Sequence, residues 1–467
     1  MRVKALLPYK ATIQGSITTV IPSLLVVVFM TLFSACQSEE TTGDSVHQTS
    51  LAFHVSTNRV VTRMSDAVTQ QKGKAYRGIM MDELWLFPFD ATPFDATETT
   101  SLISLSGNVI KVPADMKQNT ENKQNYYHDN FPEIPVNTSR FLCYARAVPE
   151  TGNSVNGSLT PSITDATTAV TPSAITFTPV TLVEAGEAIA FAYIDSDPTD
   201  EMKDEINKNN KNRFIYPPEL YYFANSTIKT SYSHQKSYYN LDWSDVLSRY
   251  ENDDATYLGD ESSVAIKDPL HYAVGCLQIG LVANATLRDA EGKAFTLSSG
   301  TFPLTGVFVT GQYEQNYDFT PKYDNEAYEK IIYDKDITGV SMGSSLAATP
   351  TVFSNTLVLQ TNDGKGIRFA LEFQNNTTET FTGSNGTVAV NGKFYLVGTI
   401  QVTTGHAGTE AYKNRVFTKD YITQGIVKIE SLKQAYTYLP DLMDPRLEVT
   451  LKLEPNWIQS TTTNVPL

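Results

Sequence analysis

The chain has 467 residues, 41% of them hydrophobic and 19% charged, and a formal net charge of −15 at pH 7. This excess of acids argues against nucleic-acid binding, which needs clustered Lys and Arg to neutralise phosphates. It favours solubility and weak non-specific adhesion instead. A chain of this length has room for two to three domains of roughly 100–200 residues each.

The start of the chain has the layout of an export signal. Its first positions carry three positive charges and no acid: Arg2, Lys4 and Lys10. An apolar run over 17–35 ends in the small residues Ser34 and Ala35, directly before Cys36. A signal peptide has this order of charge, apolar core and small-residue cleavage site. A cysteine after the small residues resembles the bacterial lipobox, so we predict a signal peptide over residues 1–35 and lipidation of Cys36.

A transmembrane helix with an incidental cysteine is the alternative, but the short apolar run and its basic start favour export. Removal of residues 1–35 would move the net charge from −15 to −18. The following "QSEE" resembles the acidic signal that sends lipoproteins to the outer surface of some Gram-negative cells. Residues 36–50 are polar and predict a flexible tether. We therefore expect a surface-exposed protein that is lipid-anchored in the cell outer membrane.

The rest of the chain predicts an all-β fold. Short runs rich in β-branched and aromatic residues, such as "ELWLFPF" and "FLCYARAV", alternate with Gly, Pro, Asn and Asp. This pattern favours β-sandwiches with a few short helices. The helices are expected over residues 197–211, 242–250 and 430–440. A polar, acidic stretch near 250–268 predicts a boundary between an N-terminal domain over 51–265 and a C-terminal domain over 266–467.

The search for chemistry predicts no enzyme, no metal site and no cofactor. The six histidines show no ligand spacing; they are His47, His54, His128, His234, His271 and His406. "GVSMG" matches the G-x-S-x-G elbow of serine hydrolases at Ser341, and His406 follows it. The residues after the motif do not favour the helix that a hydrolase needs there, so a Gly/Ser turn is the preferred interpretation.

Two further features predict packing rather than chemistry. Cys143 and Cys276 lie in apolar strand-like runs, which favours buried free thiols, although pairing is open to an exported chain. The aromatic cluster "YPPELYYF" over 216–223 fits a stacking platform for glycan rings, but a β-sandwich core is the preferred interpretation.

Several stretches, taken in their order, resemble the fimbrillin family, the lipoprotein-derived type V pilins of Gram-negative anaerobes. "YRGIMMDELWLFPFD" is similar to the entry of the family's first domain. "FPLTGVFVTGQYEQNYDFTP" (302–321) is similar to its second-domain signature, and the stretch from "VFTKDYITQG" to "LKLEPNW" (416–457) to its C-terminal part. Together with "LVLQTNDGKGIRFALEF" and the strands after it, these stretches cover most of residues 76–457.

The resemblance implies two transthyretin-like β-sandwich domains in tandem. It also implies export as a lipoprotein, cleavage by an arginine-specific or similar surface protease, and polymerisation with other pilus subunits by strand exchange. The function implied is that of a structural or accessory pilus subunit that supports adhesion. A surface glycan-binding lipoprotein of a nutrient-uptake system is the alternative, and polymerisation after proteolysis would separate the two.

The resemblance also assigns roles to two segments. The strand displaced on maturation would be 51–61, which includes Leu51, Phe53 and Val55. Cleavage would follow Arg63, with Arg59 and Arg77 as alternatives. The donor strand would lie in "RLEVTLKLEPNW", where alternation predicts one buried face; its residues are Leu447, Val449, Leu451 and Leu453. The alternative for this segment is the last strand of the chain's own second domain.

Overall fold

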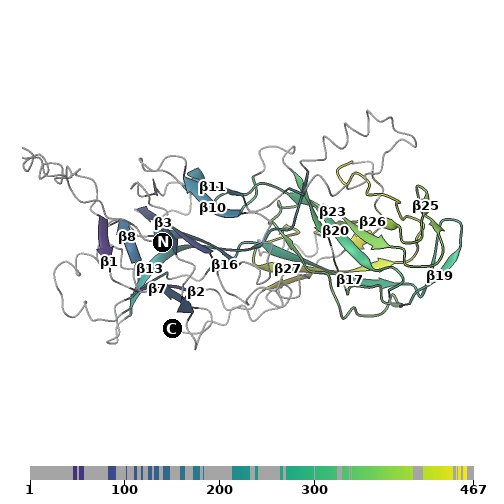
Figure 1. Cartoon of the computed structure of the whole chain (residues 1–467), viewed down its shortest axis with the longest axis horizontal. Helices are drawn as coiled ribbons and strands as arrows, with labels where there is room; N and C mark the ends of the chain where they lie inside the picture. The colour runs from purple at the N-terminus through teal and green to yellow at the C-terminus, as the bar shows by residue number, and fades with distance from the viewer. Residues whose placement is uncertain are drawn as a thin grey trace, which may run out of the picture. The chain divides into compact units, whose positions relative to one another are not determined.

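The alternating runs of the sequence form strands throughout the computed structural model (Figure 1). The structure describes short segments between 46 and 178 and then residues 182–183, 213–231, 237–239, 263–266, 270–298, 300–322, 329–335, 337, 339–402, 414–444, 447, 449, 451–453 and 456–459. All of these residues belong to one compact unit, Val46–Leu467. The prediction of an all-β fold is confirmed for this part of the chain.

Helix is nearly absent from the described residues, which contain one 3₁₀ turn at Pro172–Ala174. The predicted helix over 430–440 is wrong. Its residues form turns, in which the Leu432 N–H donates to the Arg288 carbonyl at 2.9 Å and the Ala435 N–H donates to the Leu432 carbonyl at 3.0 Å. Leu432 and Ala435 are buried in the core, so tertiary packing overrides helical propensity here. The predicted helices over 197–211 and 242–250 lie outside the described residues.

The largest sheet has eleven strands along the path β4-β3-β9-β13-β15-β2-β7-β6, with β5, β14 and β16 paired beside it. At its centre β9 (Arg140–Ala147) pairs antiparallel with β3 (Glu83–Asp90) and β13 (Leu220–Ser231). The other strands are β2 (Ala52–Ser56), β4 (Ser101–Leu102), β5 (Ile110–Val112), β6 (Lys117–Gln118), β7 (Asn125–His128), β14 (Ser237–Tyr239), β15 (Ser263–Ile266) and β16 (His271–Tyr272). Two separate pairs are β1 (Val46–Thr49) with β8 (Phe131–Pro135), and β10 (Ser158–Ile163) with β11 (Ile175–Thr178).

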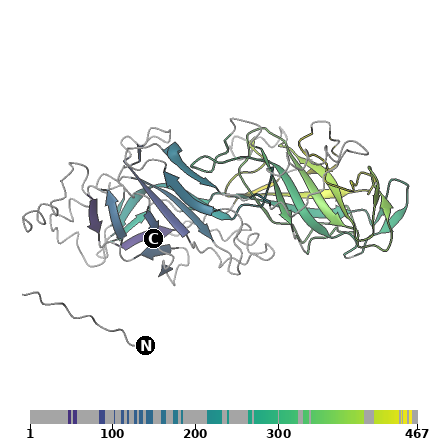
Figure 2. The same ribbon diagram turned by 45° about the horizontal axis from the view of Figure 1, so that its top comes forward.

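The second half of the chain forms two further sheets, drawn in green to yellow in Figures 1 and 2. The six-stranded sheet has the order β12 (Phe214–Ile215), β21 (Lys330–Lys335), β20 (Leu304–Gln312), β23 (Ile367–Gln374), β26 (Lys393–Ile400), β28 (Leu451–Leu453). The four-stranded sheet has the order β22 (Thr356–Val358), β17 (Gly275–Ala283), β27 (Tyr421–Ile429), β29 (Asn456–Gln459). Two small hairpins complete this half: β18 (Thr286–Arg288) with β19 (Ala294–Thr296), and β24 (Phe381–Thr382) with β25 (Thr387–Val388).

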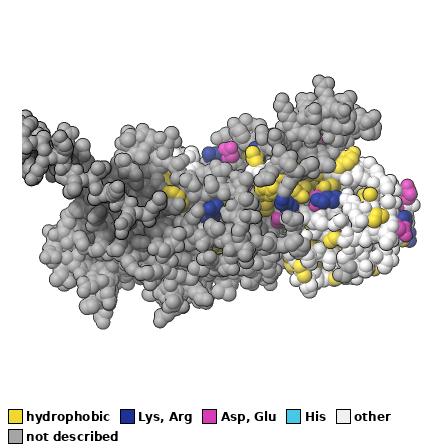
Figure 3. All heavy atoms as spheres, in the orientation of Figure 1, with side chains coloured by type: hydrophobic (Ala, Val, Ile, Leu, Met, Phe, Trp, Pro, Cys, Tyr) yellow, Lys and Arg dark blue, Asp and Glu magenta, His cyan; other side chains and the backbone are white. Residues whose placement is uncertain are grey.

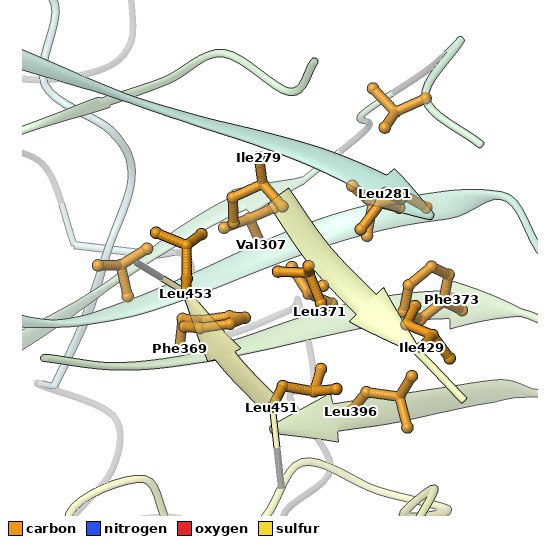
Figure 4. Packing of buried hydrophobic residues seen from close by; sticks show 14 of the residues in the cluster. Ile279, Leu281, Val307, Phe369, Leu371, Phe373, Leu396, Ile429, Leu451 and Leu453 are labelled. Carbon is orange, nitrogen blue, oxygen red and sulfur yellow. The ribbon is translucent and has the colours of Figure 1, made fainter. Parts of the chain in front are cut away.

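These two sheets share one hydrophobic core, which makes this half a β-sandwich (Figure 4). Ile279 and Leu281 of β17 contribute to it from the four-stranded sheet, and Phe369 and Leu371 of β23 from the six-stranded sheet. Each such side chain gains roughly 1.5–3 kcal/mol by leaving water. The core therefore depends on strands that face one another with alternate residues turned inward.

A second cluster covers the outer face of the six-stranded sheet, around Phe308 of β20 and Val397 of β26. Phe214 and Tyr216 cover it from one segment, and Leu439 and others from residues 436–449. Strand β12 thus joins a sheet whose other strands lie far later in the chain. Apart from β12, the strands up to β16 belong to the eleven-stranded sheet or to separate pairs, and those from β17 onward belong to the second half. The domain boundary near 265 stays a prediction. The division into two transthyretin-like domains stays a prediction.

Candidate functional site

Two long strands, one in each sheet of the sandwich, have edges that other parts of the chain cover, and we call the place that β28 takes between the sheets the groove. β26 and β27 would each be an edge strand without the short strands beside them, β28 and β29. A long bare edge exposes unpaired N–H and C=O groups and invites pairing with another strand. We name residues 436–459 the C-terminal segment, and this segment closes both edges.

Strand β28 pairs in parallel with β26, in the register Gly398↔Leu451 and Ile400↔Leu453. Such parallel pairing needs a long connection, and here residues between β26 and β28 supply it. β29 then pairs antiparallel with β27, with Tyr421 opposite Gln459. The C-terminal segment therefore crosses from one sheet to the other within a few residues.

The side chains of β28 fill the core of the sandwich. Leu451 is 8% exposed and Leu453 is 2% exposed, whereas Lys452 between them is exposed. Figure 4 shows Leu451 and Leu453 turned into the core among residues such as Phe369 and Leu396. The two leucines are worth roughly 1.5–3 kcal/mol each by burial alone. The short strand β28 therefore covers a substantial part of the core beside β26.

The four predicted donor residues do not share one face. Leu451 and Leu453 lie in the core between the sheets, but Leu447 and Val449 pack against the cluster on the outer face of the six-stranded sheet. Every second residue points to the same face only within a continuous strand. The strand begins at Leu451, so Leu447 and Val449 lie outside it. The C-terminal segment therefore passes around the β26 edge between Val449 and Leu451.

The start of this segment is firmly held on the outer face. Tyr395 of β26 and Tyr436 exchange two backbone hydrogen bonds of 2.9 Å each. The Arg368 guanidinium donates to the carbonyl oxygen of Leu442 at 3.0 Å and to that of Asp444. Leu442 is buried. These contacts end at Asp444, so they fix the segment before it turns towards the core.

A buried carboxylate stabilises the same outer face. Glu372 of β23 is 2% exposed and accepts hydrogen bonds from Thr305 Oγ1 at 2.8 Å and from the Tyr395 hydroxyl at 3.1 Å. Lys393 Nζ lies 2.9 Å from its Oε1. Burial raises the pKa of Tyr395, and the negative charge of Glu372 adds to that effect. The group is a satisfied structural network, because each partner of the carboxylate is a donor.

The predicted displaced strand has a counterpart in β2, whose Phe53 lies opposite Val264 of β15 in parallel and His128 of β7 in antiparallel pairing. Val55 belongs to the same strand and lies opposite Tyr126. Leu51, the predicted lipidation site Cys36, and Arg63 with its alternatives Arg59 and Arg77 lie outside the described residues. The two predicted segments, as far as the structure describes them, belong to different sheets.

The serine of the "GVSMG" motif lies in an exposed turn. Ser341 is exposed, and the residues after it form bends and turns instead of the helix of a nucleophile elbow. Gly343 makes an isolated bridge to Val282 on β17. The predicted partner His406 lies outside the described residues. Within the described ranges, no group of three or more His, Cys, Asp or Glu could hold a metal ion.

The cysteines and the aromatic cluster both pack inside the protein. Cys143 and Cys276 are free and buried, as predicted, and burial raises the pKa of each thiol. Tyr221 and Tyr222 of the 216–223 cluster are fully buried, and the Tyr221 ring lies 5.8 Å from that of Phe319. The core interpretation of this cluster is confirmed.

On the face visible in Figure 3, hydrophobic side chains gather near the middle of the molecule and are scattered further right. The large hydrophobic residues exposed in the described part are single ones: Leu182, Val352, Val390 and Ile426. Among the described residues there is no helix with the length and apolar character needed to span a membrane.

Two residues that contact the C-terminal segment, one on the outer face and one in the core, were not singled out from the sequence. The sequence around Arg368 does not reveal its role, because its partners are backbone carbonyls of a segment far along the chain. Gly425 does carry a sequence signal, since a glycine inside the strand-like run "YITQGIVKI" indicates a close approach of another chain segment.

No family model and no curated protein matches the chain. Solved structures are similar over most of its length. A candidate cell adhesion protein from Bacteroides eggerthii is 10% identical, with a TM-score of 0.35 over 89% of this chain and 98% of that one. The C-terminally truncated tip fimbrial protein Mfa3 from Porphyromonas gingivalis is 8% identical, with a TM-score of 0.33 over 88% and 99%. The fimbrilin FimA from the same organism is 10% identical, with a TM-score of 0.32 over 88% and 97%. Superpositions of this quality do not define a family.

Proposed function

We propose that this chain is a subunit of a cell-surface pilus that joins its neighbours by exchange of the C-terminal segment. One observation carries the proposal: β28 fills the groove between the two sheets with only three residues, two of which are buried leucines. A groove of this kind can accept any strand that makes the same backbone hydrogen bonds and carries the same buried side chains. This addition of a strand to a sheet edge is called β-augmentation. In a polymer, the segment of one subunit would occupy the groove of the next.

The maturation steps of the proposal follow the sequence resemblance. Cys36 would carry the lipid that anchors the precursor in the outer membrane. Cleavage after Arg63 by an arginine-specific surface protease would release the strand that contains Phe53 and Val55. Since β2 lies between β15 and β7, its loss would leave the facing edges of both strands unpaired. That opening lies in the eleven-stranded sheet, whereas the groove that β28 fills lies in the sandwich, so trimming would start assembly without itself emptying the groove.

The test compares assembly before and after proteolysis. The purified full chain is treated with an arginine-specific protease and examined by negative-stain microscopy and by gel electrophoresis without boiling. Trimmed protein should form polymers that resist detergent, because release of a buried strand has a high kinetic barrier. Arg63→Ala should stay untrimmed and monomeric, and Arg59→Ala and Arg77→Ala serve as matched controls. Polymers of Arg63→Ala that retain residues 51–61 would overturn this cleavage step.

A second pair of variants tests the segment itself. Leu451→Asp places a charge in the core and should abolish assembly, whereas Lys452→Asp changes the exposed face of the same strand and should assemble normally. Circular dichroism of each variant before proteolysis reports whether the subunit is folded. Normal polymers of a folded Leu451→Asp subunit would contradict a role of this strand as donor. The glycan-binding alternative receives no support from the 216–223 cluster, because its tyrosines are buried.

A further inference from the structure

Gly425 lies on the face of β27 that is turned into the core. Its neighbours on that face, Val427 and Ile429, are buried in the core, while Ile426 and Lys428 on the other face are exposed. A large apolar residue is therefore expected at position 425. Because glycine has no side chain, the backbone of β27 is open to a neighbouring side chain at this point between the two sheets.

Leu453 of β28 occupies the room that this glycine leaves. A Cβ atom added at Gly425 would lie 2.4 Å from both Cγ and Cδ2 of Leu453 and 3.0 Å from its Cδ1. Non-bonded carbon atoms prefer about 3.5–4.0 Å. The whole branched end of Leu453 thus rests against the backbone of β27, and even one methyl group at position 425 would have to displace it.

We propose that Gly425 is a notch that selects the side chain at position 453 of the strand in the groove. The side chain that fits is leucine, because its branch point and both methyl groups fill the space above the glycine. An alanine would leave a cavity, and a valine, whose methyl groups sit one carbon closer to its own backbone, would reach less far. For a strand supplied by another subunit, this selection rests on the function proposed above.

The notch also favours one register of the docked strand. A slip by one residue would turn Lys452 into the core and both leucines out of it. An unpaired lysine has no acceptor among the apolar residues around the notch, so that register is costly. The fit of Leu453 to the notch therefore favours both the sequence of the docked strand and its register.

The first experiment is a double-mutant cycle within the full chain, measured by urea unfolding. Gly425→Ala alone should lower the folding equilibrium constant about tenfold or more, because overpacking in a core is destabilising. In the Leu453→Ala background the same change should be neutral or favourable, since the added methyl enters the cavity and Ala also restricts the unfolded chain. Gly343→Ala, whose added Cβ would meet nothing closer than 3.7 Å, is the control and should act equally in both backgrounds.

The second experiment asks whether the notch reads a strand from outside. Fluorescent peptides of residues 446–459, either unchanged or with Leu453→Ala, are incubated with the protease-trimmed full chain carrying Leu451→Asp, which weakens the hold of its own β28, and with the same chain carrying Gly425→Ala as well. The unchanged peptide should be retained by the glycine groove at least about tenfold better than by the alanine groove, and the Leu453→Ala peptide should lose or reverse that preference. A Leu451→Ala peptide should bind both grooves more weakly by the same factor.

The two experiments separate two failures. Absence of coupling between positions 425 and 453 in the cycle would overturn the notch, whatever the peptides do. Coupling in the cycle together with equal retention of both peptides by both grooves would overturn selection in trans. Coupling without retention of any peptide would contradict strand exchange and confirm the notch for the chain's own strand.

Discussion

The Arg368 guanidinium on β23 donates a hydrogen bond of 3.0 Å to the carbonyl oxygen of Leu442 and therefore holds the C-terminal segment on the outer face of the six-stranded sheet. The same guanidinium also reaches the carbonyl of Asp444. Beyond Asp444 the segment turns around the β26 edge and enters the core. Arg368 therefore holds the part of the segment that comes before its passage around the β26 edge.

The first prediction concerns this contact. Arg368→Ala should destabilise the fold by roughly 1–3 kcal/mol, because two carbonyl groups lose a charged donor. Limited proteolysis should then cut the 441–450 stretch faster than in the unchanged protein. Arg415→Ala is the matched control, since the Arg415 side chain makes an ion pair of 2.7 Å with the exposed Asp363, which lies outside the C-terminal segment. Equal cleavage rates for both variants would show that Arg368 does not hold the segment.

The second prediction compares the leucines of β28 with the lysine between them. Leu453→Ala should cost about 2–5 kcal/mol of unfolding free energy, and Leu451→Ala should lie in the same range or slightly lower because Leu451 is less buried. Lys452→Ala should change stability by less than about 0.5 kcal/mol. Urea denaturation followed by tryptophan fluorescence measures all three. If both leucine variants matched Lys452→Ala, β28 would not belong to the core.

The third prediction concerns the buried carboxylate. Tyr395→Phe removes one donor from Glu372 and should cost roughly 1–3 kcal/mol, since a buried charge then lacks a hydrogen bond. Glu372→Gln in the same background should recover part of the loss, because a neutral amide tolerates the missing donor better. Thermal unfolding of the two single variants and the double variant gives the coupling free energy between positions 372 and 395. Additive effects would mean that the 3.1 Å contact contributes nothing to stability.

The fourth prediction is a pH dependence at Lys365. Its ammonium donates to Glu329 at 2.7 Å and to the Tyr313 hydroxyl at 2.5 Å. Burial lowers the pKa of Lys365, but these hydrogen bonds outweigh burial and raise the pKa above its ordinary 10.5. Because the folded pKa is the higher one, the stabilisation is complete below pH 10.5 and is lost as the pH rises through the folded value.

The measurement is the difference in melting temperature between the unchanged protein and Lys365→Met from pH 7 to pH 11. The difference should stay constant up to about pH 10 and shrink above 10.5. Lys293→Met, which removes the exposed pair of Lys293 with Glu379, should show little difference at any pH. A difference that grows above pH 10.5 would have the wrong sign and would refute the stabilising role of Lys365.

The fifth prediction concerns export. Mass spectrometry of protein from its native cell should find an acylated cysteine at position 36 as the first residue of the mature chain. Cys36→Ala should remain unprocessed. Normal trimming and surface display of Cys36→Ala would contradict the lipoprotein signal.

The sequence predicts the strands of this fold well and the path of the C-terminal segment poorly. The alternation in "RLEVTLKLEPNW" correctly places Leu451 and Leu453 on a buried face. It fails for Leu447 and Val449, because a two-residue pattern cannot reveal that the chain bends around a sheet edge and packs them, partly buried, against the opposite face. The helix expected over 430–440 fails for a related reason. Leu432, Ala435 and Leu439 have helical spacing, yet tertiary contacts bury all three from a series of turns.

The strand order of the six-stranded sheet has a consequence for how the protein is made. Its two outermost strands, β12 and β28, are the first and the last of that sheet to leave the ribosome. The nascent chain must therefore keep the β26 edge uncovered until every other strand of the sheet has been synthesised. Long-range pairings of this kind form slowly, and an open edge is a site for aggregation. Such an edge needs protection while the chain is being made, and variants that delay the pairing of β28 should reduce yield before they reduce stability.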